Sequence, residues 1–203
     1  MNIINQSHEI IEASNNILKN IEMSARTCYK SEKEITDQSS EILIKKLIKS
    51  NHFAMVEFGH ITVKFITDRG VTHELVRHRL CSFAQESTRY VNYQNKEMAF
   101  IYPVWWQAKT TDQKKIWINA MKQCATNYNQ LLDSGEAPEQ ARSILPNSLK
   151  TEIVVCANIR EWRHVLKLRT SKAAHPQMRE LMIPLLKELT KEFSCLFQDI
   201  IIS

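Results

Sequence analysis

Isoleucine and leucine recur at helical spacing over the first 21 residues and again between residues 41 and 48. Apolar positions three and four residues apart share one face of a helix, so the pattern predicts an N-terminal helix and a second helix from Glu41 to Ile48. The first prediction depends on Ile3, Ile4, Ile10, Ile11, Ile17, Leu18 and Ile21.

Two segments have the composition of strands instead. HITVKFITDR (60–69) and LKTEIVVCANI (149–159) are rich in β-branched residues, and the first stops at Gly70. A helix is predicted from Thr72, with Glu74 in its first turn and Arg77 at its end. The residues that follow Arg77 should then run from a helix C-terminus into a loop.

In the rest of the chain, the spacing of apolar residues predicts mostly helices. Residues 91–111 are irregular, whereas helices are predicted over 112–132, 137–144, 160–168 and 176–197. There is no internal repeat and no segment with the composition of a linker. The sequence therefore predicts a single α/β (α+β) domain over residues 1–203 with few strands.

Composition narrows the class of protein. The 203 residues are 43% hydrophobic and 24% charged, as in ordinary globular proteins. No window reaches the roughly 18 apolar residues of a membrane span, and the first residues lack the basic start of a secretory signal. Five widely spaced cysteines form no C-x-x-C pair, so free thiols are expected. Together these features predict a cytoplasmic protein with no membrane partner.

The positive residues are unevenly distributed. No lysine lies between Lys64 and Lys96, whereas most arginines fall in two blocks. Arginine suits phosphates and carboxylates, so the segregation indicates an anion site. The three glycines exclude both G-x-G-x-x-G and a P-loop, and a nucleotide would have to be held by side chains. The arginine blocks comprise Arg77, Arg79 and Arg89, and then Arg142, Arg160, Arg163, Arg169 and Arg179.

The stretch RHRLCSFAQESTRY (77–90) gathers many of the candidate residues. Its three leading residues would fan out on a helix, where cations suit the negative end of the helix dipole, and this structural interpretation competes evenly with a binding role. Cys81 is more readily a small, partly buried side chain than a nucleophile. The spacing of His73, His78 and Cys81 matches no standard ligand pattern, so no metal is predicted.

At this point the residues are similar to those of a known family. RHRLCSFAQESTRY resembles the R-H-R-x-x-S and S-x-R-Y signature of the flavin-dependent thymidylate synthases. The resemblance extends over residues 52–180 at least, through an upstream H-x-x-x-x-E, A-R-x-x-L-P and a downstream block. The matching residues outside the signature are His52, Glu57, Ala141, Arg142, Leu145, Pro146, Thr151, Glu152, Asn158, Arg160, Leu168 and Arg169.

The resemblance implies a small, mainly antiparallel sheet flanked by helices, and it implies an enzyme. Members methylate dUMP to dTMP with 5,10-methylenetetrahydrofolate as carbon donor and FAD, reduced by NADPH, as hydride source, and they are homotetramers with shared active sites. The dUMP site would comprise Glu74, Arg77, Gln85, Glu86, Ser87, Thr88, Arg89, Arg142 and Arg169. The FAD site would comprise Arg77, His78, Arg79, Gln85, Asn158, Arg160 and His164, with His52 near the folate or flavin.

Arg169 is the predicted catalytic residue. Its guanidinium would stabilise negative charge on the uracil ring when N3 ionises, which activates C5. Ser87 can be interpreted as a nucleophile or as a hydrogen-bond donor to dUMP, and the donor role is preferred because no neighbouring base is assured.

Several positions depart from the family pattern. Ala54 replaces a frequent Ser or Thr, Phe58 a frequent His, and Ala84-Gln85 a frequent Asn-Glu. The alternatives are a family member that has lost catalysis and a nucleic-acid-binding module that uses the same arginines.

Overall fold

The computed structural model describes residues 1–14, 16–94 and 98–202. The chain divides into two compact units. Unit 1 comprises Met1–Ser7, Phe65–Arg77 and Ala84–Val154, and unit 2 comprises His8–Lys64, His78–Phe83 and Val155–Ser203. The predicted single domain over 1–203 stays a prediction.

The described strands form two sheets. Strands β2 (Ser7–Ala13), β3 (His60–Asp68), β6 (Lys150–Asn158) and β4 (Ser82–Gln85) are hydrogen-bonded in that order. Strands β1 (Asn2–Ile4) and β5 (Ala99–Ile101) form a parallel pair. Alternate residues of β3 and β6 are buried, as expected for strands with one face against a core. The predicted fold class, with a small and mainly antiparallel sheet, is confirmed.

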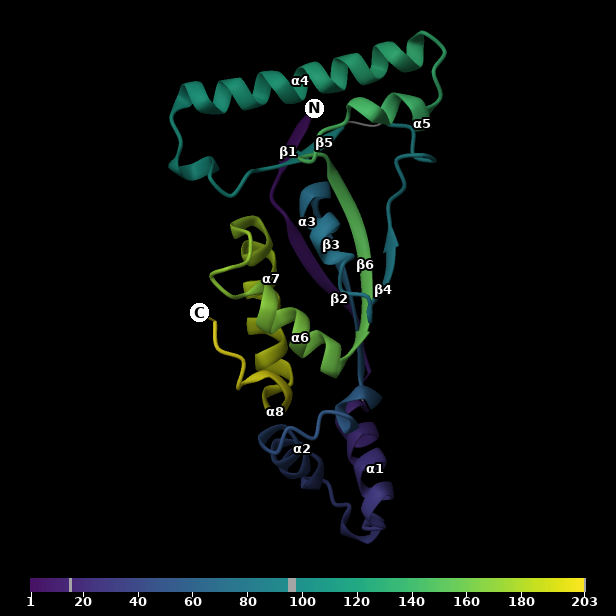
Figure 1. Ribbon diagram of the computed structural model, residues 1–203, viewed down its shortest axis with the longest axis vertical. Helices are drawn as coiled ribbons and strands as arrows, with labels where there is room; N and C mark the ends of the chain where they lie inside the picture. Colours follow the sequence, from purple (N-terminus) through teal and green to yellow (C-terminus); the bar gives the residue numbers. More distant parts are fainter. Residues whose placement is uncertain (15, 95–97, 203) are drawn as a thin grey trace. The chain divides into compact units, whose positions relative to one another are not determined.

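Unit 1 is built around a long helix, α4 (Thr111–Asp133), which runs across the top of Figure 1 above β1 and β5. Thr110 begins the helix with a reciprocal capping box to Gln113, and the chain leaves it through Gly135, whose φ is 99°. The aromatic residues Tyr93, Phe100 and Tyr128 lie in the hydrophobic core of this unit. The shorter elements of unit 1 are α3 (Arg69–Leu75), α5 (Pro138–Ala141) and the 3-10 helices η3 (Trp106–Ala108) and η4 (Arg142–Ile144).

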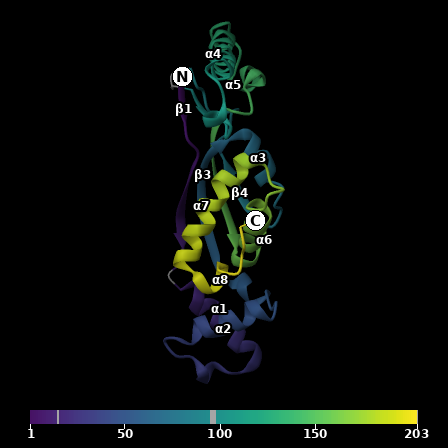
Figure 2. The same ribbon diagram turned by 90° about the vertical axis from the view of Figure 1, so that its left-hand side faces the viewer.

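Unit 2 is mostly helical. Helices α6 (Ile159–Arg169) and α7 (Pro176–Glu192) pack together, as do α1 (Ile17–Tyr29) and α2 (Ser39–Lys49), and Figure 2 shows both pairs. Trp162 of α6 is fully buried and donates a 2.8 Å hydrogen bond to the carbonyl of Ile61 in β3. The unit also contains α8 (Ser194–Phe197) and the 3-10 helices η1 (Glu32–Glu34) and η2 (Met55–Phe58).

Most predicted elements are confirmed, with one clear error at the N-terminus. The helix predicted from Thr72 to Arg77 is present but shifted, because α3 begins at Arg69 and ends at Leu75. Where one helix was predicted over Ile3–Ile21, the chain forms β1 and β2 before α1 begins. In β2 the half-buried residues His8 and Ile10 alternate with exposed ones, and β-branched isoleucine suits a strand. The loop predicted after Arg77 contains β4, and the irregular segment 91–111 contains β5 and η3. Residues 95–97 of that segment lie outside the described residues.

No helix among the described residues is both long enough and apolar enough to cross a membrane.

Candidate functional site

The predicted dUMP residues other than Arg169 all lie in unit 1. Glu74 is half-buried in α3, while Arg77 is exposed just beyond the end of that helix. Backbone hydrogen bonding continues from the helix to this point, because the Arg77 N–H donates to the Glu74 carbonyl over 3.3 Å. The end of α3 therefore presents a carboxylate and a guanidinium one turn apart.

Gln85, at the end of β4, is tied into unit 1 by its amide. Its Nε2 donates to the hydroxyl of Thr72 at 2.9 Å and to that of Thr151 at 3.3 Å. The Arg69 guanidinium lies 3.5 Å from the Thr151 hydroxyl and 3.4 Å from the Glu86 carbonyl. The amide nitrogen thus serves as a structural donor, and the amide oxygen is the atom through which Gln85 could contact a ligand.

Glu86 also has internal partners. The Tyr93 hydroxyl donates to one carboxylate oxygen at 2.7 Å, and the Lys150 ammonium lies 3.2 Å from the other. Burial and then the bond to Glu86 raise the pKa of Tyr93, so the phenol stays protonated and keeps donating. Glu86 is held by both oxygens in this arrangement, which anchors the turn that follows it.

That turn carries Ser87, Thr88 and Arg89. The Ser87 hydroxyl accepts the Arg89 N–H at 3.3 Å, and Arg142 donates to the buried Thr88 hydroxyl at 3.3 Å. Arg89 is about half exposed and lies 3.4 Å from Glu139. Two guanidinium groups are therefore attached to one short turn, which suits an anionic ligand.

The three residues of the RHR motif differ in burial, as expected for consecutive side chains that point in different directions. His78 is only 5% exposed, whereas Arg77 and Arg79 on either side are exposed. The RHR motif thus places a buried imidazole in unit 2 and leaves two cations facing solvent.

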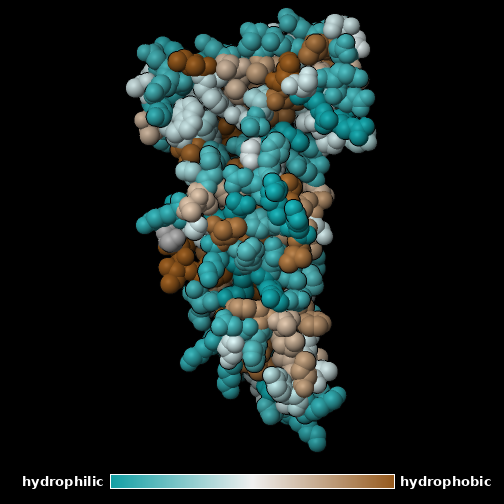
Figure 3. Space-filling view, viewed as in Figure 1, coloured by the Kyte–Doolittle hydropathy of each residue, from teal (hydrophilic) through white to brown (hydrophobic). Residues whose placement is uncertain are grey.

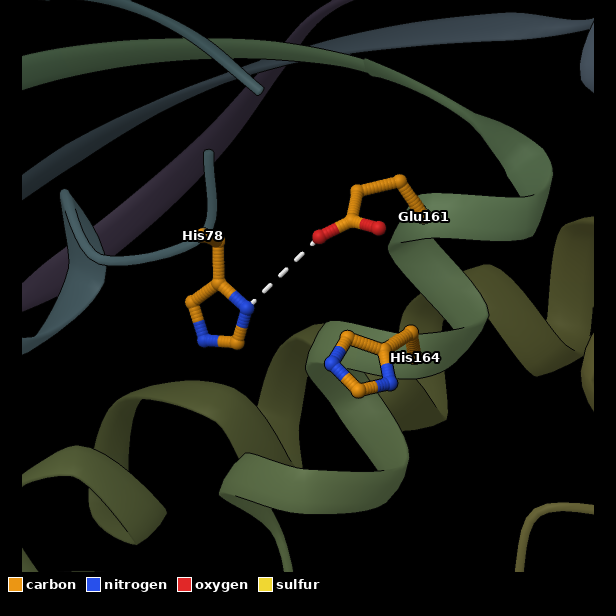
Figure 4. Close-up of side chains that lie close together, drawn as sticks. All are labelled: His78, Glu161 and His164. Carbon is orange, nitrogen blue, oxygen red and sulfur yellow. Dashed lines mark ion pairs between the residues drawn. The ribbon is translucent and has the colours of Figure 1, made fainter. Parts of the chain in front are cut away.

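In unit 2, His78 contacts the helix α6. The Arg169 Nε donates a 2.9 Å hydrogen bond to His78 Nε2, while the other ring nitrogen, Nδ1, lies 3.6 Å from a Glu161 oxygen. Figure 4 shows His78 and Glu161 facing each other, with His164 one turn further along the helix. Burial, then the charge of Arg169 and the His164 ring, lower the His78 pKa from 6.5 to about 4. The imidazole is therefore neutral at physiological pH.

His78, Glu161 and His164 also place three potential metal-ligand atoms within 4.8 Å of one another. The hydrogen bond from Arg169 nevertheless requires the His78 proton to be on Nδ1, so this nitrogen presents a proton to Glu161 and no lone pair. The adjacent guanidinium opposes a further cation as well. These two features make the cluster a poor site for a metal ion.

Arg160 and His164 share a face of α6, as their spacing predicts, and both line a cavity of about 530 Å³. A second cavity, of about 440 Å³, is lined by His52, Ala54 and again Arg160. Arg160 lies 2.6 Å from Glu57 and is half exposed. Cations on the lining of the first cavity, including Lys167, suit a ligand with phosphate groups.

Asn158 begins α6 as its N-cap, with its side chain accepting the Glu161 N–H at 2.8 Å. This contact fixes the start of the helix that carries Arg160, His164 and Arg169. The side-chain oxygen of Asn158 has a structural role, so any contact with a ligand would use its amide nitrogen.

Three residues beside the predicted set were missed from the sequence. Asn51 and Phe53 line both cavities, and no local pattern indicates this. Glu161 could have been found, because an acid three residues after an Asn N-cap is a helix-start signal.

Cys81 does not have the properties of a nucleophile. Burial, then the charge of Glu161 and the thiol of Cys156, raise its pKa to about 12. The thiol is therefore protonated at neutral pH, when only the thiolate attacks efficiently.

The chain as a whole is similar to known proteins. Residues 9–193 match the family described as thymidylate synthase complementing protein. A flavin-dependent thymidylate synthase of Mycobacterium tuberculosis is 31% identical over 199 residues, covering 88% of this chain and 78% of the relative. One from Geobacter sulfurreducens is 29% identical over 187 residues, covering 88% and 80%.

Solved structures show the same fold. A UMP/dUMP methylase, PolB, from Streptomyces cacaoi bound with 5-Br dUMP has a TM-score of 0.82 at 24% identity, over 98% of this chain and 96% of that one. Thymidylate Synthase X from Helicobacter pylori with FAD and dUMP has a TM-score of 0.78 at 23% identity, over 96% and 98%.

Proposed function

Since this chain belongs to the flavin-dependent thymidylate synthases, we propose that it converts dUMP to dTMP with 5,10-methylenetetrahydrofolate as carbon donor and NADPH as the reductant of FAD. The observation that carries the proposal is the arrangement in unit 2. His78 contacts Arg169, while His164 lies beside His78 and lines a cationic cavity together with Arg160.

The residues present fit a flavin. FAD carries a pyrophosphate and flat rings, and the cavity that Arg160, His164 and Lys167 line offers positive charge next to the aromatic ring of Phe53. Asn158 holds the start of the same helix, and His52 lines the adjoining cavity. Once bound, the cofactor would supply hydride chemistry, and the protein would orient it and exclude water.

In the proposal, dUMP is bound by the turn after Glu86. The guanidinium groups of Arg89 and Arg142 would meet the phosphate, with Ser87 and Thr88 as hydroxyl donors. Glu74, Arg77 and Gln85 complete the proposed nucleotide site.

The proposed catalytic group is Arg169. A guanidinium held at its Nε by His78 would stabilise negative charge on the uracil ring during attack by C5. No protein nucleophile is required, which agrees with the protonated thiol of Cys81.

The homotetramer that the family resemblance implies and the cytoplasmic location expected from the sequence belong to this proposal as well. Figure 3 shows hydrophobic side chains among hydrophilic ones over α4. Among the exposed apolar side chains, Ile116 of α4 is 71% exposed and Leu80 in unit 2 is 79% exposed. Both are candidate contacts between subunits, and size-exclusion chromatography with light scattering would measure the subunit number.

The test of the reaction is to purify the protein with FAD, reduce it with NADPH and add dUMP with methylenetetrahydrofolate. We expect a yellow protein whose reduced flavin is re-oxidised, with dTMP detected by mass spectrometry. A yellow protein without turnover would indicate the impaired family member. A colourless protein with salt-dependent affinity for nucleic acid would support the binding module instead.

A further inference from the structure

Glu161 is a buried acid outside the predicted site. It is only 7% exposed and occupies the third position of α6, where its own N–H is capped by Asn158. An acidic side chain in the first turn of a helix is favoured by the helix dipole. That location explains how a carboxylate is tolerated in the interior, and the contact with His78 indicates what it does there.

The two ring nitrogens of His78 have different partners. Nε2 accepts the hydrogen bond from Arg169 Nε at 2.9 Å, so it carries a lone pair, and the single proton of the neutral ring must be on Nδ1. Nδ1 lies 3.6 Å from the Glu161 carboxylate, too long for a hydrogen bond but close enough for attraction to the N–H dipole. Arg169 and Glu161 therefore select the same tautomer independently.

We propose that Glu161 is a positioning residue: it holds the His78 proton on Nδ1, so that Nε2 accepts from Arg169 and fixes the guanidinium for the uracil ring of dUMP. The inference rests on the proposed function for its last step only. The tautomer and the contact between His78 and Arg169 are properties of this chain, whatever its substrate.

Other groups near the ring act in the same direction. The His164 ring meets His78 edge to face with centroids 5.8 Å apart, and both it and Arg169 lower the His78 pKa, so they oppose a second proton on the ring. Of the two arginines near Glu161 in sequence, Arg160 pairs with Glu57 and Arg163 is engaged by both oxygens of Asp199. Among the described contacts of His78, Glu161 is thus the acid that faces Nδ1.

The kinetic test compares two variants. Glu161→Ala removes the carboxylate, and misorientation of a catalytic group by about 1 Å costs on the order of 10²-fold, so we expect kcat/KM for dUMP to fall about tenfold to a hundredfold. Glu161→Gln keeps an oxygen facing Nδ1 and should stay within about threefold of the wild type. The loss should fall mainly on kcat, because Arg169 acts in the transition state.

Glu41→Ala is the matched control, because Glu41 is the third residue of α2, just as Glu161 is of α6, and it is exposed. It reports the general effect of removing an acid from a first turn, and we expect it to leave kcat/KM unchanged. Equal losses in Glu161→Ala and Glu161→Gln, or an unimpaired Glu161→Ala enzyme, would overturn the assignment.

A spectroscopic measurement needs no turnover, and its first result needs only the wild-type protein. In the wild-type protein labelled with ¹⁵N-histidine, the two ring-nitrogen shifts of His78 should show the Nδ1–H tautomer at pH 7, and Glu161→Ala should shift them towards a mixture. An Nε2–H ring in the wild type would overturn the inference. Absence of dTMP formation by a wild-type protein with the expected tautomer would instead count against the proposed function, so the two failures are distinguishable.

Discussion

Arg169 and His78, 91 positions apart in the sequence, are joined by a hydrogen bond from the guanidinium Nε to the imidazole Nε2. The ring that accepts this bond is buried, and its pKa is lowered to about 4. The hydrogen bond and the lowered pKa depend on each other. A protonated ring could not accept from arginine, and a nearby guanidinium disfavours that proton. Acid should therefore break the contact and weaken the fold.

We expect the free energy of unfolding to fall as the pH is lowered, because folding lowers the pKa of His78. Its ring binds a proton near pH 6.5 when unfolded but only near pH 4 when folded, so the free energy of unfolding is fully preserved above pH 6.5 and falls towards pH 4. Between pH 7 and pH 5 the loss from this group should be about 1–2 kcal/mol. Urea denaturation at both pH values would measure it.

In His78→Gln this part of the pH dependence should disappear. His60→Gln is the control, because His60 is exposed and should leave the slope as it is. An unchanged slope in His78→Gln would contradict the buried, neutral ring.

Arg169 and Ser87 should differ sharply in their kinetic importance. Arg169→Ala should lower kcat about a thousandfold, the size expected when a group that stabilises transition-state charge is lost. Ser87→Ala should retain turnover with a higher KM for dUMP, because the Ser87 hydroxyl contacts the Arg89 backbone and is assigned a donor role. Steady-state kinetics and dUMP titration would separate these effects. Complete loss of activity in Ser87→Ala with intact dUMP binding would instead establish a nucleophile.

The ion pair of Arg163 and Asp199 should stabilise the C-terminal part of unit 2. Both Arg163 Nη atoms contact the Asp199 carboxylate, at 2.7 and 2.6 Å, and the arginine lies over the Phe53 ring. Asp199→Ala leaves a buried guanidinium with fewer partners, so the free energy of unfolding at pH 7 should fall by about 1–2 kcal/mol, reduced from the fully buried case because Asp199 is half exposed.

The hydrogen bonds from Arg163 lower the pKa of Asp199, so the contribution of this pair is present above pH 4 and is lost as the pH falls through the lowered value. Asp112→Ala, at an exposed position on α4, is a control that should cost less. Equal costs in the two variants, measured by urea denaturation, would contradict the prediction.

Gly59 is required by close packing. A Cβ at this position would lie 2.9 Å from Ile17 and 3.0 Å from Ile159, while the Gly59 carbonyl accepts the Ile159 N–H at 2.9 Å. Its φ of −106° needs no glycine, so the expected cost of Gly59→Ala, about 1–3 kcal/mol, comes from overpacking alone. In a double-mutant cycle with Ile17→Ala, the two losses should sum to more than the loss of the double variant. Strict additivity would argue against this contact.

The sequence predicts elements well where pattern and capping agree. Helix α4 is found from its apolar spacing and Gly135, and β6 from its β-branched run. The N-terminal strands are missed because Ile3 and Ile4 recur seven positions later as Ile10 and Ile11, which is a helical spacing. Only pairing with distant residues, such as that of β1 with β5, shows that these segments are strands.

The same distinction applies to the candidate site, where the sequence indicates which residues take part but not which contacts they make. Motifs identify His78 and Arg169 as candidates, yet nothing local indicates that they contact each other or that Glu161 faces the imidazole. The sequence predicts that Glu86 contacts the nucleotide, but in the structure it is bonded to Tyr93, seven positions on, and to Lys150, 64 positions on. Such contacts depend on tertiary structure, which spacing does not encode.

The division of the chain also determines how the protein can be taken apart. Each unit consists of three separate segments, and β2, β3, β4 and β6 each have residues in both. The polypeptide therefore crosses from one unit to the other five times, and no single proteolytic cut releases either one as a continuous fragment. Every single cut would instead separate residues that belong to the same unit, so neither unit can be obtained as an independent fragment in this way.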